Sequence, residues 1–282
     1  MTVELVNKTP EIPLPTDKLL LVDLDKTLID SSYQITDQDI FEEIQRVQSL
    51  GWQIGLSSDT PLEIMQNWKR EFGMNGPIIA ERGALLQLVD GTEIELIQNS
   101  REYFINLRKE FVSQVSNKNI PLYIGDAVSF LRNKTKLTGS TDKNIVLVNA
   151  YRKCSLGFWG RSIDNSGELN VDNSLMEELL RDFDSVLTNP PFELERDFNR
   201  DYGIFIVSPR EVNKRVGTQR LMSELHLTKI GMIGDSKTDI VGSDIAMHYA
   251  VGNARQELSS ISDYRSTQDY TNGVVDILKK IK

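Results

Sequence analysis

Two aspartates one residue apart, Asp23 and Asp25, end a short apolar run in the segment LLLVDLDKTLIDSS, and Thr27 follows them. On an extended segment, side chains two positions apart project to the same side. Neighbouring carboxylates push each other's pKa values apart, so that one can act as a nucleophile while the other carries a proton. The spacing therefore indicates a pair of carboxylates with separate chemical tasks.

Two further polar clusters follow apolar runs elsewhere in the chain. The run WQIGLSSD ends in Ser57, Ser58 and an aspartate, and the run KIGMIGDS contains Asp235, with Asp239 four positions later. Carboxylate oxygens suit Mg²⁺, which binds one or two protein carboxylates together with a phosphate oxygen. The hydroxyls of Thr27 and Ser58 are suited to hydrogen-bond phosphate oxygens. Together the clusters indicate phosphate chemistry assisted by a cation.

A candidate fixed cation for an anionic substrate is Lys214, in the segment EVNKRVG ahead of the helix that leads to KIGMIGDS. The net charge of the chain is −9, so its average field repels polyanions. We therefore expect no nucleic-acid or membrane partner, and a small phosphorylated metabolite as the ligand. No apolar run reaches the roughly 20 residues of a membrane span. With no signal segment and a single cysteine, Cys154, the sequence predicts a cytoplasmic protein.

The three apolar runs have the length and the apolar character of strands buried on both faces of a parallel sheet. Amphipathic helical segments separate these runs, at TDQDIFEEIQRVQSLG, TPLEIMQNWKREFG and NKRVGTQRLMSELHL. This alternation predicts an α/β fold with a Rossmann-like, doubly wound parallel sheet core. Because ligands bind beyond the carboxyl ends of parallel strands, the three polar clusters should meet at one edge of the sheet.

The middle of the chain, residues 86–207, has a different pattern. Candidate strands, several at hairpin spacing, occur at ALLQLV, TEIELI, NIVLVNAYRKCSLGFWG and GIFIVS. Candidate helices occur at SREYFINLRKEFVSQVS and DNSLMEELLRDFDSVL. We therefore predict an inserted α+β cap domain over 86–207, between a first core part at 1–85 and a second core part at 208–282.

With these residues placed, the chain resembles the haloacid dehalogenase-like superfamily, in its Cof-like branch with a large α/β cap. The segment DLDKT matches the first motif of the family, and Ser58, Lys214 and GDSKTD match the next three. The segments PIIAERGALLQ and MHYAVGNARQEL resemble further stretches of that branch. Lys26, Arg82 and Thr238 depart from the usual Gly, Asn and Asn, and SSDTP stands where TGRP is usual, which leaves the substrate class open.

The resemblance implies a phosphoric monoester hydrolase that forms an aspartyl-phosphate. It implies that Asp23 attacks phosphorus and that Asp25 protonates the leaving group and then activates water. It implies a Mg²⁺ ion at Asp23, Asp25 through its carbonyl, and Asp235, with Asp239 at the ion or at Lys214. The residues that it implies for substrate binding are Thr27, Ser58 or Ser57, Lys214 and Asn253.

Three other functions use similar residues. A phosphomutase returns the phosphoryl group to a hexose phosphate, and a phospho-acceptor domain without catalysis clusters acidic residues and a lysine at strand ends. A nucleotide-sugar glycosyltransferase also binds a metal through D-x-D, but DLDKT lies on the first strand without a preceding nucleotide-binding stretch. The sequence has no glycine-rich phosphate-binding loop and no dinucleotide-binding glycine motif. This argues against a kinase and against a dehydrogenase. Because a large cap excludes polymers, we expect the substrate to be a sugar phosphate or a short-acid phosphate. The sequence predicts no oligomeric state.

Overall fold

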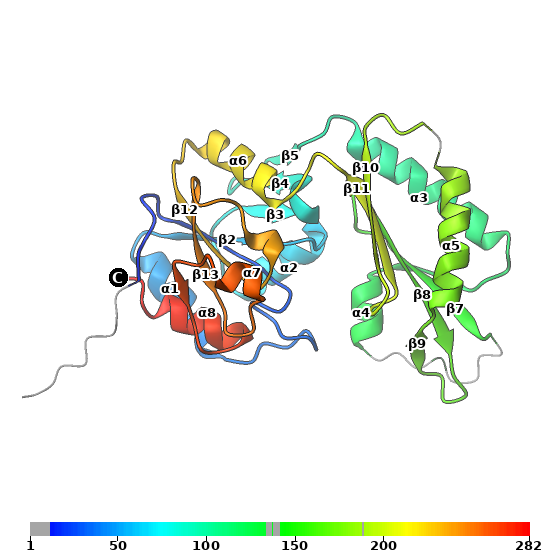
Figure 1. Ribbon diagram of the computed structural model, residues 1–282, viewed down its shortest axis with the longest axis horizontal. Helices are drawn as coiled ribbons and strands as arrows, with labels where there is room; N and C mark the ends of the chain where they lie inside the picture. The colour runs from blue at the N-terminus through cyan, green and yellow to red at the C-terminus, as the bar shows by residue number, and fades with distance from the viewer. Residues whose placement is uncertain (1–11, 134–136, 138–141, 188) are drawn as a thin grey trace, which may run out of the picture.

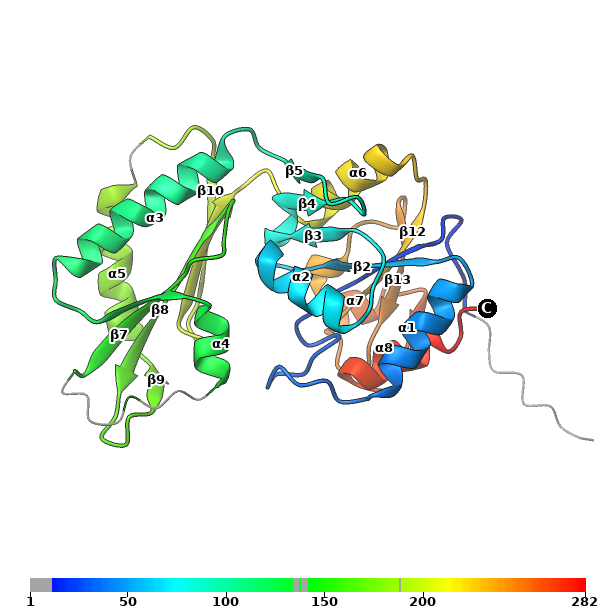
Figure 2. The same ribbon diagram turned by 180° about the vertical axis from the view of Figure 1, so that it is seen from behind.

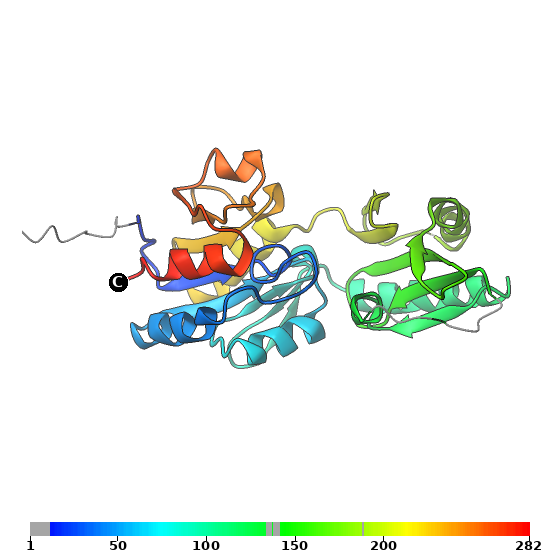
Figure 3. The same cartoon turned by 90° about the horizontal axis from the view of Figure 1, so that it is seen from below.

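The computed structural model describes residues 12–133, 137, 142–187 and 189–282. The chain forms two bodies, each built on its own sheet, and crosses between them twice (Figure 1). Seen from below, the two bodies lie side by side, with the C-terminus at the end of the first body that is far from the second (Figure 3). No helix in the described residues has the length and the apolar character to span a membrane.

The first body is built on an eight-stranded sheet in the order β14-β13-β12-β1-β2-β3-β4-β5. Its parallel strands are β1 (Leu19–Val22), β2 (Gln53–Ser57), β3 (Ile78–Ala80), β12 (Ile230–Gly234), β13 (Ala246–Ala250) and β14 (Tyr264–Arg265). Two antiparallel strands, β4 (Leu85–Gln87) and β5 (Glu93–Glu95), extend one edge. This sheet confirms the predicted α/β class with a parallel core.

Helices cover both faces of this sheet. They are α1 (Asp39–Ser49), α2 (Leu62–Glu71), α6 (Lys214–Leu225), α7 (Gln256–Ser259) and α8 (Tyr270–Leu278). In β1, Leu20 and Val22 pack into the apolar cluster formed with α1, α2 and α8, whereas Leu19 and Leu21 pack into the cluster formed with α6. Burying one such side chain contributes roughly 1.5–3 kcal/mol. Burial on both faces therefore fixes the strand that ends at Asp23.

The second body is the inserted α+β cap, whose main sheet has the order β10-β11-β8-β7-β6. Its strands are β6 (Leu122–Gly125), β7 (Asn144–Asn149), β8 (Leu156–Ile163), β9 (Leu169–Val171), β10 (Leu194–Asn199) and β11 (Ile204–Pro209), with β9 paired to β8. Residues alternate along β7, so that Val146 and Val148 face α3 (Ser100–Ser116) and α5 (Asn173–Val186), whereas Ile145 and Leu147 face α4 (Ala127–Arg132). Figure 2 shows α4 on the side toward the first body.

The structure corrects two expectations about the inserted segment. The sequence placed residues from 86 onward in the cap, but β4 pairs with β3 and β5 pairs with β4, so both strands belong to the sheet of the first body. Leu86 packs beneath α6, and this long-range contact has no local signal in the sequence. The segment NIVLVNAYRKCSLGFWG, predicted to be strand, contains β7 and the first part of β8, with a loop at 150–155 between them that was not predicted.

Candidate active site

The polar clusters meet at one edge of the first sheet because their strands are neighbours. Strand β1 lies between β2 and β12 and runs parallel to both. Asp23 directly follows β1, Ser58 follows β2 and Asp235 follows β12. The amide of Asp23 donates to the carbonyl of Ile233 at 2.9 Å, so the first carboxylate is tied to the neighbouring strand. The arrangement agrees with the rule for the carboxyl ends of parallel strands.

A buried lysine joins two of the carboxylates. Lys214, the first residue of α6, is 3% exposed, and its Nζ lies 2.6 Å from Asp23 Oδ1 and 2.5 Å from Asp239 Oδ1. Burial alone lowers the pKa of this lysine, but the attraction of the two carboxylates outweighs it and raises the pKa above its ordinary value. Lys214 therefore stays charged, and it fixes one oxygen of Asp23 in place.

Asp239 hydrogen-bonds both to Lys214 and to the turn in which it lies. Its Oδ2 accepts hydrogen bonds from the amides of Asp235 and Ser236, at 3.2 and 3.0 Å, and from the hydroxyl of Ser236 at 3.1 Å. Its Oδ1 is taken by Lys214. Because both oxygens have partners, Asp239 is placed to hold the turn after β12 and to orient the lysine.

The carboxylate of Asp235 is in a different position. It is 8% exposed, and no donor in the described part of the chain hydrogen-bonds to it. Burial, and then the neighbouring Asp239, raise its pKa to about 6. Ligand atoms of Asp23, Asp235 and Asp239 lie within 4.8 Å of one another. A nearly buried carboxylate without a hydrogen-bond donor, beside a second carboxylate, is a suitable ligand for a hard divalent cation.

Asp25 points away from this group and toward the end of β2. Its Oδ2 accepts from the hydroxyl of Thr60 at 2.9 Å and from that of Ser58 at 3.4 Å. Burial raises its pKa, against the effect of the Thr60 hydrogen bond. A carboxyl group with a raised pKa next to a reacting centre suits proton transfer. Thr60, two positions after Ser58, is thus a second hydroxyl partner of Asp25, which was not among the predicted site residues.

Comparison with known proteins decides the family. A sequence model of the haloacid dehalogenase-like hydrolases matches residues 20–278, which is nearly the whole chain. This chain belongs to the haloacid dehalogenase-like hydrolases. The matched segment includes the acidic cluster and Lys214, the lysine that contacts it.

Relatives with a named activity are similar over almost their full length. The phosphoglycolate phosphatase of Sulfolobus acidocaldarius is 24% identical over 269 residues, which are 94% of this chain and 96% of that protein. Phosphoglycolate phosphatase 1 of Saccharolobus solfataricus is 26% identical over 271 residues, 94% and 95% of the two chains. The solved structure of a haloacid dehalogenase-like hydrolase from Bacteroides thetaiotaomicron has a TM-score of 0.67 at 15% identity, covering 95% of this chain and 100% of that one. The chain is a phosphoric monoester hydrolase of this family.

The other expected site residues of the hydrolase lie around Asp23. The hydroxyl of Thr27 donates to Asp23 Oδ2 at 3.2 Å. The Oγ atom of Ser57 is buried and has no hydrogen-bond partner in the described residues, whereas Ser58 contacts Asp25. Asn253 donates to the backbone carbonyl of Lys26 at 2.8 Å, so in the structure it supports the loop that follows β1.

The two bodies of the hydrolase are joined near the site by a buried glutamate that sequence reasoning missed. Glu81 is fully buried, and its carboxylate accepts from the amides of Lys153 and Cys154, at 2.7 and 2.9 Å, and from the hydroxyl of Ser155 at 2.5 Å. All three donors lie in the β7–β8 loop of the cap. Burial raises the pKa of Glu81. The β7–β8 loop is therefore the docking point of the cap on Glu81.

Charged side chains surround this docking point. Arg82 lies 2.9 Å from Asp197 of β10 and 3.6 Å from Asp59, and Arg152 lies 3.4 Å from the same Asp59. Trp159 of β8 is buried in the cluster beside α4. Arg82, one of the departures from the family pattern, thus joins the two bodies.

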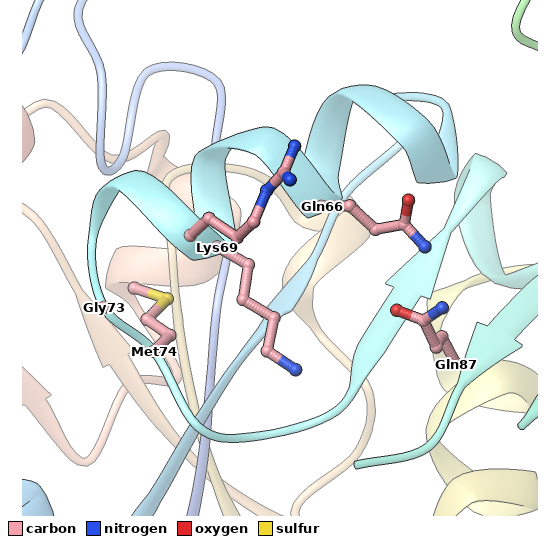
Figure 4. Close-up of a pocket in the computed structure, with 6 residues that line it drawn as sticks. Gln66, Lys69, Gly73, Met74 and Gln87 are labelled. Carbon is pink, nitrogen blue, oxygen red and sulfur yellow. The ribbon is translucent and has the colours of Figure 1, made fainter. Parts of the chain in front are cut away.

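A separate hollow of about 480 Å³ lies between the end of α2 and β4 (Figure 4). Its lining residues are Gln66, Lys69, Arg70, Gly73, Met74 and Gln87. None of these residues belongs to the acidic cluster. This hollow is therefore separate from the candidate active site at the end of β1.

Proposed function

We propose that this hydrolase is a Mg²⁺-dependent phosphatase that cleaves a small organic phosphate monoester, a sugar phosphate or a short-acid phosphate, through an aspartyl-phosphate intermediate. The observation that carries the proposal is the carboxylate of Asp23, held at the end of a buried strand by Lys214 and Thr27. Two relatives are named phosphoglycolate phosphatases, which favours a short-acid phosphate.

Each residue has a separate role in the proposed reaction. One oxygen of Asp23 attacks phosphorus and forms an acyl phosphate, while Asp25 gives its proton to the leaving alkoxide. Asp25, now a carboxylate, then takes a proton from the water that attacks the acyl phosphate, and Asp23 is released. Lys214 offsets negative charge beside Asp23 throughout. Asp239 keeps this lysine in position.

The acidic cluster fits a resident Mg²⁺ ion. Asp23, Asp235 and the carbonyl of Asp25 would hold it, since the carboxylate of Asp235 lacks a hydrogen-bond donor in the described residues. When bound, the ion supplies positive charge that lets an anionic carboxylate approach an anionic phosphate.

Stability of the metal-free protein should depend on pH and on Mg²⁺. The folded-state pKa of Asp235, about 6 against an ordinary 3.8, means that the folded protein binds this proton more tightly than the unfolded chain does. The proton on Asp235 therefore adds to the free energy of unfolding below about pH 4, and this contribution is lost as pH rises through about 6. A shift of two pKa units corresponds to roughly 3 kcal/mol of that free energy. The raised pKa values of Asp23 and Asp25 act in the same direction.

Thermal unfolding with EDTA or with excess Mg²⁺ measures both effects. Mg²⁺ should raise the unfolding temperature more at about pH 7 than at about pH 5, because the ligands must be deprotonated. Asp235→Asn should remove most of the increase. An equal increase in wild type and Asp235→Asn, or no increase in wild type, would contradict the assigned metal ligands.

A panel of phosphate esters, assayed with Mg²⁺ and with EDTA, tests the function itself. We expect repeated turnover with release of inorganic phosphate from short-acid phosphates or sugar phosphates in Mg²⁺, and loss of this release in EDTA. Isomerisation of a hexose phosphate without phosphate release would instead identify a mutase. Phosphate release unchanged by EDTA would remove the metal from the proposal.

A further inference from the structure

Lys26 directly follows Asp25 and has an unusual backbone conformation. Its φ is +61°, a left-handed backbone conformation that glycine adopts freely and that lysine rarely adopts. Asn253 fixes this conformation by donating to the carbonyl of Lys26 at 2.8 Å, and Asn253 is itself fixed by the amide of Tyr270, also at 2.8 Å. This strained position comes directly after Asp25, in the loop that follows β1.

The ammonium of Lys26 reaches the cap. Its Nζ donates to the hydroxyl of Tyr202 at 2.8 Å and lies 5.1 Å from the centre of that ring. Tyr202 is in the β10–β11 turn and is 52% exposed. Arg161, which is nearly buried, holds this turn by donating to the carbonyls of Tyr202 and Gly203, at 2.8 and 3.1 Å. Hydrogen bonds from the cap thus hold the backbone of Tyr202, as a hydrogen bond from the core holds the backbone of Lys26.

The pair has unused donors and an unmatched charge. No carboxylate among the described residues lies within ion-pair distance of Lys26, in a chain whose net charge is −9. A lysine ammonium has three protons, and the tyrosine hydroxyl that accepts one of them still has its own to give. Lys26 is also close enough to Asp235 to lower the pKa of that carboxylate. The pair therefore offers a positive charge and further hydrogen-bond donors beside the acidic cluster.

We propose that Lys26 and Tyr202 together bind a carboxylate of the substrate, on the side of the molecule away from the phosphate. The inference rests on the proposed phosphatase function and narrows its substrate class to phosphorylated short acids. Lys26 supplies the charge, Tyr202 supplies a directed hydrogen bond, and neither takes part in the bond changes at phosphorus. Charge-assisted hydrogen bonds from both bodies select the acid over a neutral alcohol of the same size.

Two esters of matched size test the proposal. Phosphoglycolate carries the carboxylate, and 2-hydroxyethyl phosphate has a hydroxymethyl group in its place. Lys26→Met should raise KM for phosphoglycolate by about 10- to 100-fold, the factor that a hydrogen bond to a charged group supports, with a much smaller change in kcat. Its loss of kcat/KM for 2-hydroxyethyl phosphate should be at least about tenfold smaller. Tyr202→Phe, which keeps the ring, should show the same preference with a smaller effect.

Two further variants control for backbone strain and for the change in net charge. Lys26→Gly removes the side chain and relieves the positive φ, so it should fold at least as well as wild type and still show the loss of carboxylate preference. Lys109→Met, an exposed lysine on α3, changes the net charge equally and should leave both esters unaffected.

Equal losses on the two esters in Lys26→Met and Tyr202→Phe, or no loss on either, would overturn the carboxylate site while leaving the phosphatase function in place. Absence of phosphate release from both esters and from p-nitrophenyl phosphate in wild type would instead overturn the proposed function, and the carboxylate site with it.

Discussion

Replacing Asp23 by asparagine should lower phosphate release by at least about 10⁴-fold while the fold is retained. The amide nitrogen and carbonyl of asparagine are poor nucleophiles, so no acyl phosphate forms. The substitution is nearly isosteric, and Lys214 keeps its contact with Asp239 at 2.5 Å. Steady-state release of p-nitrophenolate from p-nitrophenyl phosphate, with thermal unfolding of the same sample, measures both quantities.

The control for this substitution is Asp90→Asn. Asp90 lies in the exposed turn between β4 and β5, where its side chain accepts from the amide of Thr92 at 2.9 Å, a bond that asparagine can also accept. This variant should match wild type in rate. Comparable rates for Asp23→Asn and wild type would remove Asp23 as the nucleophile.

Asparagine at position 25 should separate the two chemical steps. For an alkyl phosphate, which needs a proton on its leaving oxygen, Asp25→Asn should lose about 10²- to 10⁴-fold in kcat. For p-nitrophenyl phosphate the first step needs little protonation, but the second still lacks its base. We therefore expect a burst of p-nitrophenolate close to one equivalent per active site, followed by slow turnover.

The asparagine at position 25 can still accept from the Thr60 hydroxyl, so the loop should stay in place. Rapid-mixing measurement of p-nitrophenolate detects the burst, and acid quenching detects the phosphorylated protein. A loss of equal size for both esters, without a burst, would show that Asp25 is not the proton donor.

The pattern of the sequence predicted the part of the site that local physics determines. A strand buried on both faces must be apolar and short, so the run that ends at Asp23 could be identified, and parallel neighbours follow from the strand–helix alternation. Asp23 and Asp235 come together because each directly follows a buried strand, and Lys214 reaches Asp23 as the first residue of α6.

The rest depends on contacts between distant residues. Nothing near Glu81 indicates that its carboxylate will accept amides from the 150–155 loop, or that Arg82 will meet β10. The short strand at Leu85–Gln87 carries no local signal for either sheet, and its pairing with β3 and the packing of Leu86 beneath α6 assign it to the first. Positive φ values at Lys26, Glu81 and Arg82 likewise come from tertiary contacts that override local preference.

The origin of the charged groups has a consequence for turnover. Asp23, Lys214, Asp235 and Asp239 all belong to the first body, whereas Tyr202 belongs to the cap. A rotation of the cap would withdraw Tyr202 from Lys26 without changing any distance among the four groups. Substrate could then enter and product could leave while the four groups stay in place. The contact of Tyr202 with Lys26 would have to form again in every catalytic cycle, whereas the arrangement of the reactive residues would not.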